Sequence, residues 1–432
     1  MDDEATHGAG PWRKPGPPGR PTDTVPLMTS EDVLELVLVI AVAVVAPLLA
    51  ASVRRFAMPA VVLEIGFGIL IGPQVLGLVR PTAVTEALAT LGLSMLMFLA
   101  GYELRIRAIR GRPLTLGIGS WLISLVLAAG VGYVLHVIGG HSGEIVVPLA
   151  LTTTALGTLL PVLRDAGVLH TEMGRYALAL GSVGEFGPII LIGLLLTGDD
   201  TVRSLTFLAG FAVLIVVSAL LASRSWSEGV VSAISRGLTS SSQLPVRMTM
   251  LFMLALTAVA IELGLDVLIG AFAAGIVARI ASGGHGEDDE TVSSTIYANK
   301  LEGIGFGMLV PIFFVLSGVA IDVRSLVQDP EVLVLVPVFL VLMLVVRAVP
   351  TFICYRRALD REDRRALSVL SAAGLPLIVV VTTIAVQNGY LGGADAAAMV
   401  AAGMLSVLVF PAVALAILGR KQSVPTEPGS GL

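Results

Sequence analysis

The sequence, 432 residues long, lacks most of the residue patterns on which enzymes depend. A single cysteine, Cys354, excludes an internal disulfide and a metal site built from several cysteines. The five histidines show no spacing typical of metal ligands, and there is no phosphate-binding glycine loop and no nucleophile elbow. No segment resembles a nucleotide-binding domain that would drive ATP-dependent pumping. We therefore expect neither an enzyme nor a cofactor requirement, and no nucleic-acid partner.

Charge is also scarce, and long apolar runs take its place. Charged residues make up only 14% of the chain, 55% is hydrophobic and the mean hydropathy is +0.92, which is unlike any soluble globular domain. Apolar runs of about 20 residues, the length that crosses a bilayer as a helix, recur along the chain. We predict an all-α polytopic membrane protein with thirteen spans. These spans are residues 33–52, 59–79, 84–102, 114–138, 145–165, 173–197, 204–222, 246–263, 266–281, 302–321, 331–355, 366–387 and 393–418.

Basic residues alternate from one connection to the next. The odd-numbered connections and the C-terminal tail contain, or lie beside, 20 of the 27 lysines and arginines, whereas the even-numbered connections contain three. By the positive-inside rule this predicts an outside N-terminus and a cytoplasmic C-terminus. We expect residues 1–30 to form a disordered tail, residues 31–418 the transmembrane domain and residues 419–432 a cytoplasmic tail.

Two of the predicted spans carry residues that interrupt helices. The fifth and twelfth spans occupy the middle of two trios, spans four to six and eleven to thirteen, which begin on opposite sides of the membrane. This arrangement is typical of an inverted repeat, and paired interruptions of this kind predict a transport site near the bilayer midplane. The alternative is that glycine and proline only kink these helices. The helix-breaking residues are Gly157 and Pro161, beyond three adjacent threonines, and Gly374 and Pro376.

Each trio also contains one charged residue within the apolar stretch. Glu185 lies in span six, where a carboxylate costs about 2.5–3.5 kcal/mol, so we predict that it binds an ion or carries a proton. Arg347 lies in span eleven, and placed opposite Glu185 it would be the charge partner of that acid. The alternatives are a structural pair for Glu185 and snorkelling to the membrane surface for Arg347.

Hydroxyl groups near Glu185 could complete a shell for a monovalent cation. Such groups are hard oxygen ligands, and four of them lie within a turn of Glu185 or at the predicted helix break. The alternative is that each hydroxyl bonds back to a carbonyl of its own helix. The candidate cation ligands are Ser182, Thr152, Thr153 and Thr154.

Several segments resemble the monovalent cation:proton antiporter family, which comprises the sodium/hydrogen exchangers and related potassium-efflux antiporters. Residues 58–78 and 307–322 carry the more specific similarity, residues 91–105 and 268–277 add to it, and the likeness runs in order from 33 to 418. The resemblance implies a sodium/proton antiporter-like fold with two parts. A core bundle of two inverted trios with crossed discontinuous helices would occupy about 114–197 and 331–418. A dimerisation domain of about 33–102 and 204–321 would form a homodimer.

The resemblance also assigns roles to the charged residues. Glu185 occupies the position of the family's ion-binding aspartate, and Arg347 a position where relatives carry lysine or arginine. Relatives precede the aspartate with Asp, Asn or Gln, whereas this chain has Gly184. With one carboxylate in place of two, we expect electroneutral exchange.

The function implied is a secondary active antiporter of the plasma (inner) membrane that exchanges Na⁺ or K⁺ for H⁺ by alternating access. Two alternatives remain open at the level of the sequence. One is a cation-coupled symporter of an organic anion that uses Arg347 as a substrate ligand. The other is a non-transporting membrane sensor that retains the fold.

Overall fold

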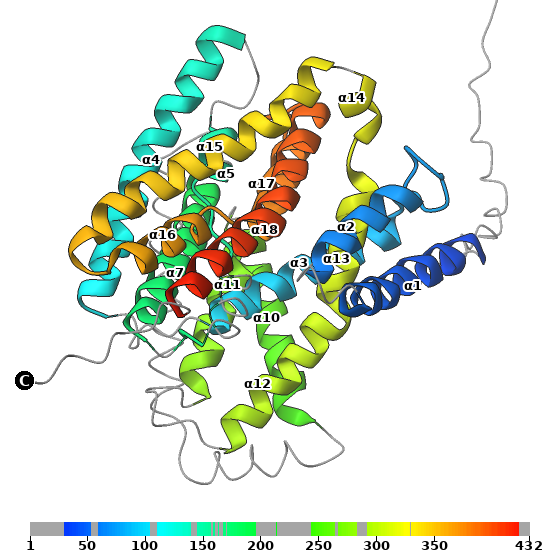
Figure 1. Cartoon of the computed structure of the whole chain (residues 1–432). Helices are drawn as coiled ribbons and strands as arrows, with labels where there is room; N and C mark the ends of the chain where they lie inside the picture. The colour runs from blue at the N-terminus through cyan, green and yellow to red at the C-terminus, as the bar shows by residue number, and fades with distance from the viewer. Residues whose placement is uncertain are drawn as a thin grey trace, which may run out of the picture.

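The computed structural model describes residues 30–52, 59–103, 110–139, 145–156, 171–195, 243–263, 267–282, 292–328 and 330–422, together with 159, 163, 167–169 and 213. All regular secondary structure in this part of the chain is helical (Figure 1). The helices are α1 (Ser30–Ser52), α2 (Ala60–Ile71), α3 (Ala83–Glu103), α4 (Arg112–Gly139), α5 (Val146–Leu151), α7 (Glu172–Leu195), α10 (Leu244–Glu262), α11 (Val267–Ala281), α12 (Val292–Ile304), α13 (Val310–Ala320), α14 (Val323–Gln328), α15 (Pro330–Cys354), α16 (Arg361–Leu370), α17 (Leu375–Gln387) and α18 (Gly393–Gln422). A π-helical turn, Gly305–Leu309, joins α12 to α13, and a 3-10 turn, Tyr355–Arg357, follows α15.

The described helices match the expected spans. Nine helical segments in this part of the chain are long and apolar enough to cross a membrane, and the shorter apolar helices α2 and α11 accompany them. Every expected span contains a described helix except residues 204–222, of which only residue 213 is described; nearly all of the N-terminal tail also lies outside the described residues. Large apolar side chains on α1 and α4 face outward, and Val126 is 72% exposed, as expected of a surface that contacts lipid. The chain is a multi-pass membrane protein, while thirteen spans and their orientation stay predictions.

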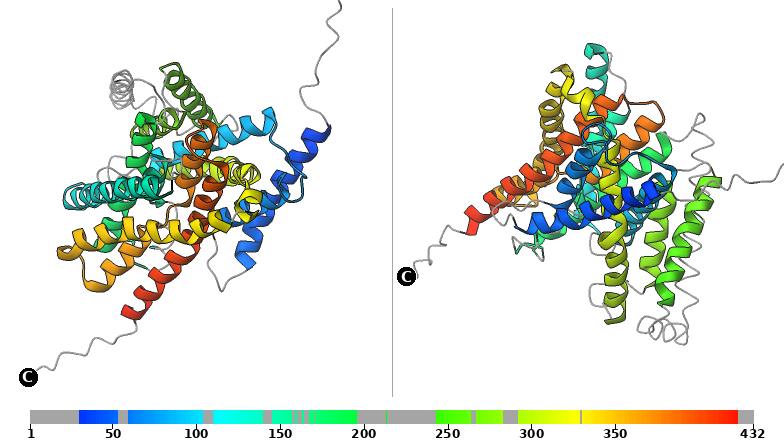
Figure 2. Two further views of the ribbon diagram at one scale, coloured as in Figure 1. Left: turned by 90° about the horizontal axis from the view of Figure 1, so that it is seen from above. Right: turned by 90° about the vertical axis from the view of Figure 1, so that its right-hand side faces the viewer.

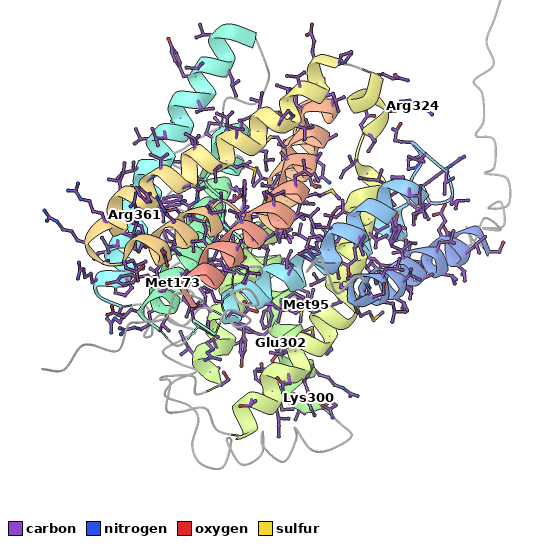
Figure 3. All side chains as sticks on the ribbon, viewed as in Figure 1. Met95, Met173, Lys300, Glu302, Arg324 and Arg361 are labelled. Atoms are coloured by element: carbon purple, nitrogen blue, oxygen red, sulfur yellow. The ribbon has the colours of Figure 1, made fainter. Side chains whose placement is uncertain are left out.

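Several charged side chains lie near the two ends of the helical bundle (Figure 3). Figure 3 shows Arg324 at one end of the molecule, and Lys300 and Glu302 at the other end. The helical path from α12 through α13 connects these two ends. This separation is what a helix crossing a bilayer requires, because charged groups stay near water.

The contacts between helices fall into two groups. The first group contains α1, α2, α3, α10, α11, α12 and α13, and the second contains α4, α5, α7 and α15 to α18. Figures 1 and 2 place α1 and α4, one from each group, at opposite sides of the molecule. The helices of the first group come from the residue ranges expected for the dimerisation domain, and those of the second from the ranges expected for the core bundle, but the division into two domains stays a prediction. Their roles in dimerisation and movement stay predictions.

Glycines bring the helices of the first group into close contact. A Cβ atom on Gly101 of α3 would collide with the carbonyl oxygen of Phe272 on α11, and one on Gly275 with the carbonyl of Phe98. The pair α2 and α13 repeats this arrangement with its own glycines. Because lipid tails are as apolar as leucine, helices in membranes associate through such close packing of small residues. The first group is therefore held together by backbone-to-backbone contact.

We expect Gly101→Ala to destabilise the protein by about 1–3 kcal/mol, because the colliding atom belongs to the backbone and cannot rotate away. The purified protein in detergent would show a lower melting temperature in a thermal-shift measurement. Gly130→Ala is the control, because Gly130 on α4 has open space around its Cβ position. Equal melting temperatures for both variants would contradict the proposed packing of α3 against α11.

Candidate functional site

The fifth predicted span is interrupted after one and a half turns. Helix α5 ends at Leu151, and residues 153–155 are not helical, whereas Leu156 is. The hydroxyls of Thr152 and Thr153 donate to the carbonyl oxygens three residues earlier, both at 2.8 Å. These bonds satisfy carbonyls that the end of a helix leaves without partners. The other predicted break residues of this span, Gly157 and Pro161, lie outside the described residues.

The twelfth predicted span is interrupted at the predicted glycine. Helix α16 ends at Leu370 and α17 begins at Leu375, with Gly374 as the preceding cap residue. Pro376 lies in the first turn of α17, where its missing N–H costs no helical hydrogen bond. A Cβ atom on Gly374 would lie 2.6 Å from Oγ1 of Thr153, so only glycine permits this approach.

The two interruptions meet and bond to each other. The backbone N–H of Ala155 donates to the carbonyl of Ala373 at 2.8 Å, and the Thr154 hydroxyl donates to the carbonyl of Ser371 at 2.6 Å. The N–H of Thr154 donates to the carbonyl of Gly184 on α7 at 2.9 Å. Backbone groups freed inside a membrane must find partners within the protein. We call this contact between residues 152–156 and 371–374 the crossing.

Arg347 on α15 is the charged group of the crossing, and its side chain has no exposed surface. Nε and Nη2 donate to the hydroxyl oxygen of Thr154 at 2.9 and 2.6 Å. Nε also donates to the carbonyl of Ser371 at 3.3 Å, and Nη1 to the hydroxyl of Ser124 at 3.2 Å. Thr154 and Ser371 follow the C-terminal ends of α5 and α16, where the helix dipole is negative. The guanidinium is thus stabilised by helix ends and hydroxyls.

These contacts differ from the expected arrangement in two respects. Both Glu185 and Arg347 are described, and no ion pair joins them, so Arg347 is not the direct charge partner of Glu185 in this structure. Snorkelling does not occur either, since the side chain is fully buried. Thr154 accepts two bonds from Arg347 and donates one to Ser371. Its oxygen is saturated, so Thr154 has no lone pair left for a cation.

Glu185 lies on α7 and bonds to the crossing at Leu156. Its side chain is partly buried, and its Oε2 accepts a hydrogen bond from the backbone N–H of Leu156 at 3.2 Å. Leu156 is the first helical residue after the interruption, and amides at the start of a helix favour negative charge. The two charged side chains therefore bond to opposite ends of interrupted helices. The arginine lies at C-terminal ends, and the carboxylate lies at an N-terminal end.

The remaining candidate ligands bond to their own helices. The Ser182 hydroxyl donates to the carbonyl of Leu178 at 2.7 Å, as Thr152 and Thr153 do to theirs. This is the alternative that the sequence left open. Their oxygen atoms keep lone pairs, so a role as cation ligands stays a prediction for these three residues.

Gly184 has a structural reason to be glycine. A Cβ atom at this position would lie 2.6 Å from Nη2 of Arg347 and 2.7 Å from Oγ1 of Thr154. The space that a side chain would occupy next to Glu185 is filled by the guanidinium. In this structure the absence of a side chain at Gly184 leaves room for both Arg347 and Thr154.

Sequence reasoning missed several polar residues around the site. Ser124 lies one turn after Ser120 on α4, and the Thr351 hydroxyl, one turn after Arg347, donates to the carbonyl of that arginine at 2.8 Å. Polar residues one helical turn apart in an apolar helix share one face, and this spacing could have identified them from the sequence.

Comparison with known proteins places this architecture in a family. Residues 40–418 match the family described as "Sodium/hydrogen exchanger, transmembrane". The sodium proton antiporter MjNhaP1 of Methanocaldococcus jannaschii, whose structure was solved at pH 8, superposes with a TM-score of 0.63. That match covers 91% of this chain and all of the other, at 17% identity, and so demonstrates similarity of fold.

Two curated relatives add sequence similarity. The chain is 26% identical to the putative Na⁺/H⁺ antiporter YjbQ of Bacillus subtilis, over 93% of this chain and 65% of the relative. It is 30% identical to cation/H⁺ antiporter 19 of Arabidopsis thaliana, over 68% of this chain and 38% of the relative. The chain thus spans about two thirds or less of the length of these relatives.

We expect Thr154→Val to lower the melting temperature of the purified protein by several degrees. The substitution keeps the shape of the side chain but removes the oxygen that joins Arg347 to Ser371, and each bond to a charged group contributes roughly 1.5–3 kcal/mol. Thr154→Ser keeps the hydroxyl and is the matched control. If the valine variant and the wild type have the same melting temperature, the stability of the crossing does not depend on these hydrogen bonds.

Proposed function

Because the chain belongs to the sodium/hydrogen exchanger family, we propose that it is a secondary active antiporter that exchanges Na⁺ or K⁺ for H⁺. One observation of the site carries the proposal, namely the hydrogen bond that the Glu185 carboxylate accepts at the start of an interrupted helix. The proposed location is the plasma membrane, and the proposed assembly is a homodimer formed through the first group of helices.

Glu185 would hold a proton and a cation in turn. An ionised carboxylate accepts the Leu156 N–H bond and binds a monovalent cation with its remaining lone pairs. Protonation removes the negative charge and releases the cation, so the two ions compete for one group. Lone pairs of Ser182, Thr152 and Thr153, together with carbonyls freed at the crossing, would supply further oxygen ligands.

Access to the site would alternate through movement of the second group of helices against the first. The crossing and Arg347 belong to the second group, so they would move as one unit with Glu185. Binding near the midplane and movement of one bundle against another is the general design of inverted-repeat transporters.

The symporter alternative is disfavoured by the contacts of Arg347. An organic anion bound through this arginine would need exposed N–H groups, but the side chain is fully buried and bonded to three residues. The sensor alternative predicts no ion flux. It is separated from antiport by the experiment on Glu185.

We expect Glu185→Gln to abolish exchange, because glutamine carries no charge and cannot take up or release a proton at any working pH. Proteoliposomes containing a pH-sensitive dye would report proton movement on addition of Na⁺ or K⁺. The wild type should respond to at least one of the two ions, which also identifies the substrate. Glu262→Gln, at the exposed end of α10, is the control and should transport normally. Cation-dependent proton movement that persists in Glu185→Gln would refute the proposed role.

We further expect the exchange to be electroneutral, since Gly184 leaves Glu185 as the single acid at this point of α7. One carboxylate that holds either H⁺ or one monovalent cation moves no net charge per cycle. Proteoliposomes on a solid-supported membrane should therefore give no transport current under a cation gradient. A current that reverses at a potential set by unequal ion numbers would contradict one-for-one exchange.

A further inference from the structure

Helix α7 contains a proline in the turn that follows Glu185. Pro188 is buried, and the helix continues through it to Leu195. In an α-helix each N–H donates to the carbonyl four residues earlier, but proline has no N–H. The carbonyl of Gly184 therefore lacks its usual donor within α7. The proline ring also pushes this carbonyl away, because the two would otherwise collide.

The freed carbonyl is used by the interrupted fifth span. The N–H of Thr154 donates to the carbonyl oxygen of Gly184 at 2.9 Å. Thr154 lies beyond the end of α5, so its N–H has left the hydrogen-bond pattern of that helix. Backbone groups that lose their helical partners inside a membrane must find others within the protein. Here a proline in one helix and an interruption in another supply the acceptor and the donor of a single bond.

This bond differs in kind from the hydrogen bond that joins Glu185 to the crossing. The N–H of Leu156 donates to Oε2 of Glu185, a group that exchanges a proton for a cation under the proposed function. Its strength varies through the cycle, since an ionised carboxylate is a stronger acceptor than a protonated one. The Gly184 carbonyl does not ionise. The bond from Thr154 can therefore hold α7 against the crossing in every charge state of the site.

We propose that Pro188 is a positioning residue for the ion site. By leaving the Gly184 carbonyl without a donor in α7, it anchors this helix to Thr154 and sets the position of Glu185 relative to the crossing. The proposal rests on the antiport function proposed above. The proposed cation shell combines Glu185 with hydroxyl and carbonyl oxygens of the crossing, so its geometry depends on how these two elements are joined.

An N–H group at position 188 would compete for the same carbonyl. Any residue other than proline can donate to Gly184 from within α7 and draw its carbonyl back toward the helix axis. The bond from Thr154 would weaken, and Glu185 would move relative to the oxygens of the crossing. The cation should then bind less tightly. The maximal rate should change much less, because the bond joins two elements of the second group and not the two groups that move against each other.

The test measures proton movement in proteoliposomes at increasing concentrations of Na⁺ or K⁺, whichever the wild type transports. We expect Pro188→Ala to raise the apparent KM for the cation about threefold to tenfold, with a much smaller change in the maximal rate. Pro188→Val also adds an N–H but keeps roughly the volume of the ring, and it should raise the KM to the same extent. A wild-type KM in the valine variant alone would assign the effect to lost packing and overturn the proposal.

Pro411→Ala is the matched control. Pro411 also lies inside a helix of the second group, α18, and frees the carbonyl of Val407. In the described part of the chain no N–H from another helix bonds to that carbonyl. The KM of this variant should equal that of the wild type. An equal rise of the KM in the Pro411 and Pro188 variants would show a general effect of removing a helix proline and would contradict the specific role.

A second measurement follows the anchor without transport. The Trp121 ring on α4 is buried against α7, where a Cβ atom on Gly187 would collide with it. With the other two tryptophans, Trp12 and Trp226, replaced by phenylalanine, the fluorescence of Trp121 reports on this turn of α7. Both Pro188 variants should shift its emission maximum, whereas Pro411→Ala should not.

Hydrogen exchange measured by mass spectrometry reports on the bond itself. In both Pro188 variants the peptide that contains Thr154 should exchange faster than in the wild type, because its amide has lost a firm acceptor. Unchanged exchange and unchanged emission in these variants would overturn the proposed anchor, whatever their KM. Both measurements remain usable if a variant binds cations too weakly for transport to be followed.

The outcomes separate the two proposals. No cation-dependent proton movement in the wild type would overturn the antiport function, while fluorescence and hydrogen exchange would still decide whether Pro188 anchors α7. Normal wild-type transport with an unchanged KM in both Pro188 variants would overturn the positioning role alone.

Discussion

The buried guanidinium of Arg347 is the constraint on which the rest of the site depends. A charge inside a membrane protein is tolerated only with a full set of hydrogen-bond partners, and here the partners are the ends of two interrupted helices. Thr154 can bond to both Arg347 and Ser371 only because α5 stops before it. Gly184 must remain without a side chain so that the guanidinium fits. The interruptions, the arginine and the glycine therefore form one interdependent unit.

This unit separates the charge that holds the structure from the charge that would bind ions. If Arg347 were paired directly with Glu185, each uptake of a cation would have to break a buried ion pair, which costs several kcal/mol. Arg347 instead stabilises C-terminal helix ends, and among the residues that the structure describes Glu185 accepts a hydrogen bond from the amide of Leu156. The carboxylate keeps lone pairs for exchange while the crossing stays intact. The opposite ends of interrupted helices thus provide electrostatic support for both signs of charge.

The sequence predicts the features of this arrangement that depend on neighbouring residues, and it does not predict the contacts between residues that are far apart in the chain. Gly374, the threonines before Leu156 and both charged residues were identifiable because an interruption or a charge in an apolar span has a high local cost. The partners of Arg347 were not identifiable, because hydroxyls such as those of Ser124 on α4 and Thr154 after α5 are equally common in helices where they bond only to their own carbonyls. The contact of Phe186 on α7 with Phe272 on α11 depends on tertiary packing, which no local pattern contains.

The three kinds of packing in the molecule suggest where movement costs least. Within the second group of helices, the crossing is held by directional hydrogen bonds, and within the first group glycines lock backbones together. Between the groups, next to Glu185, lies the contact of Phe186 with Phe272, which is apolar and has no directional bond to break. Sliding at this contact leaves both groups intact. Under the proposed function, the motion that exposes Glu185 to one side of the membrane or the other would therefore occur at this boundary between the two groups of helices.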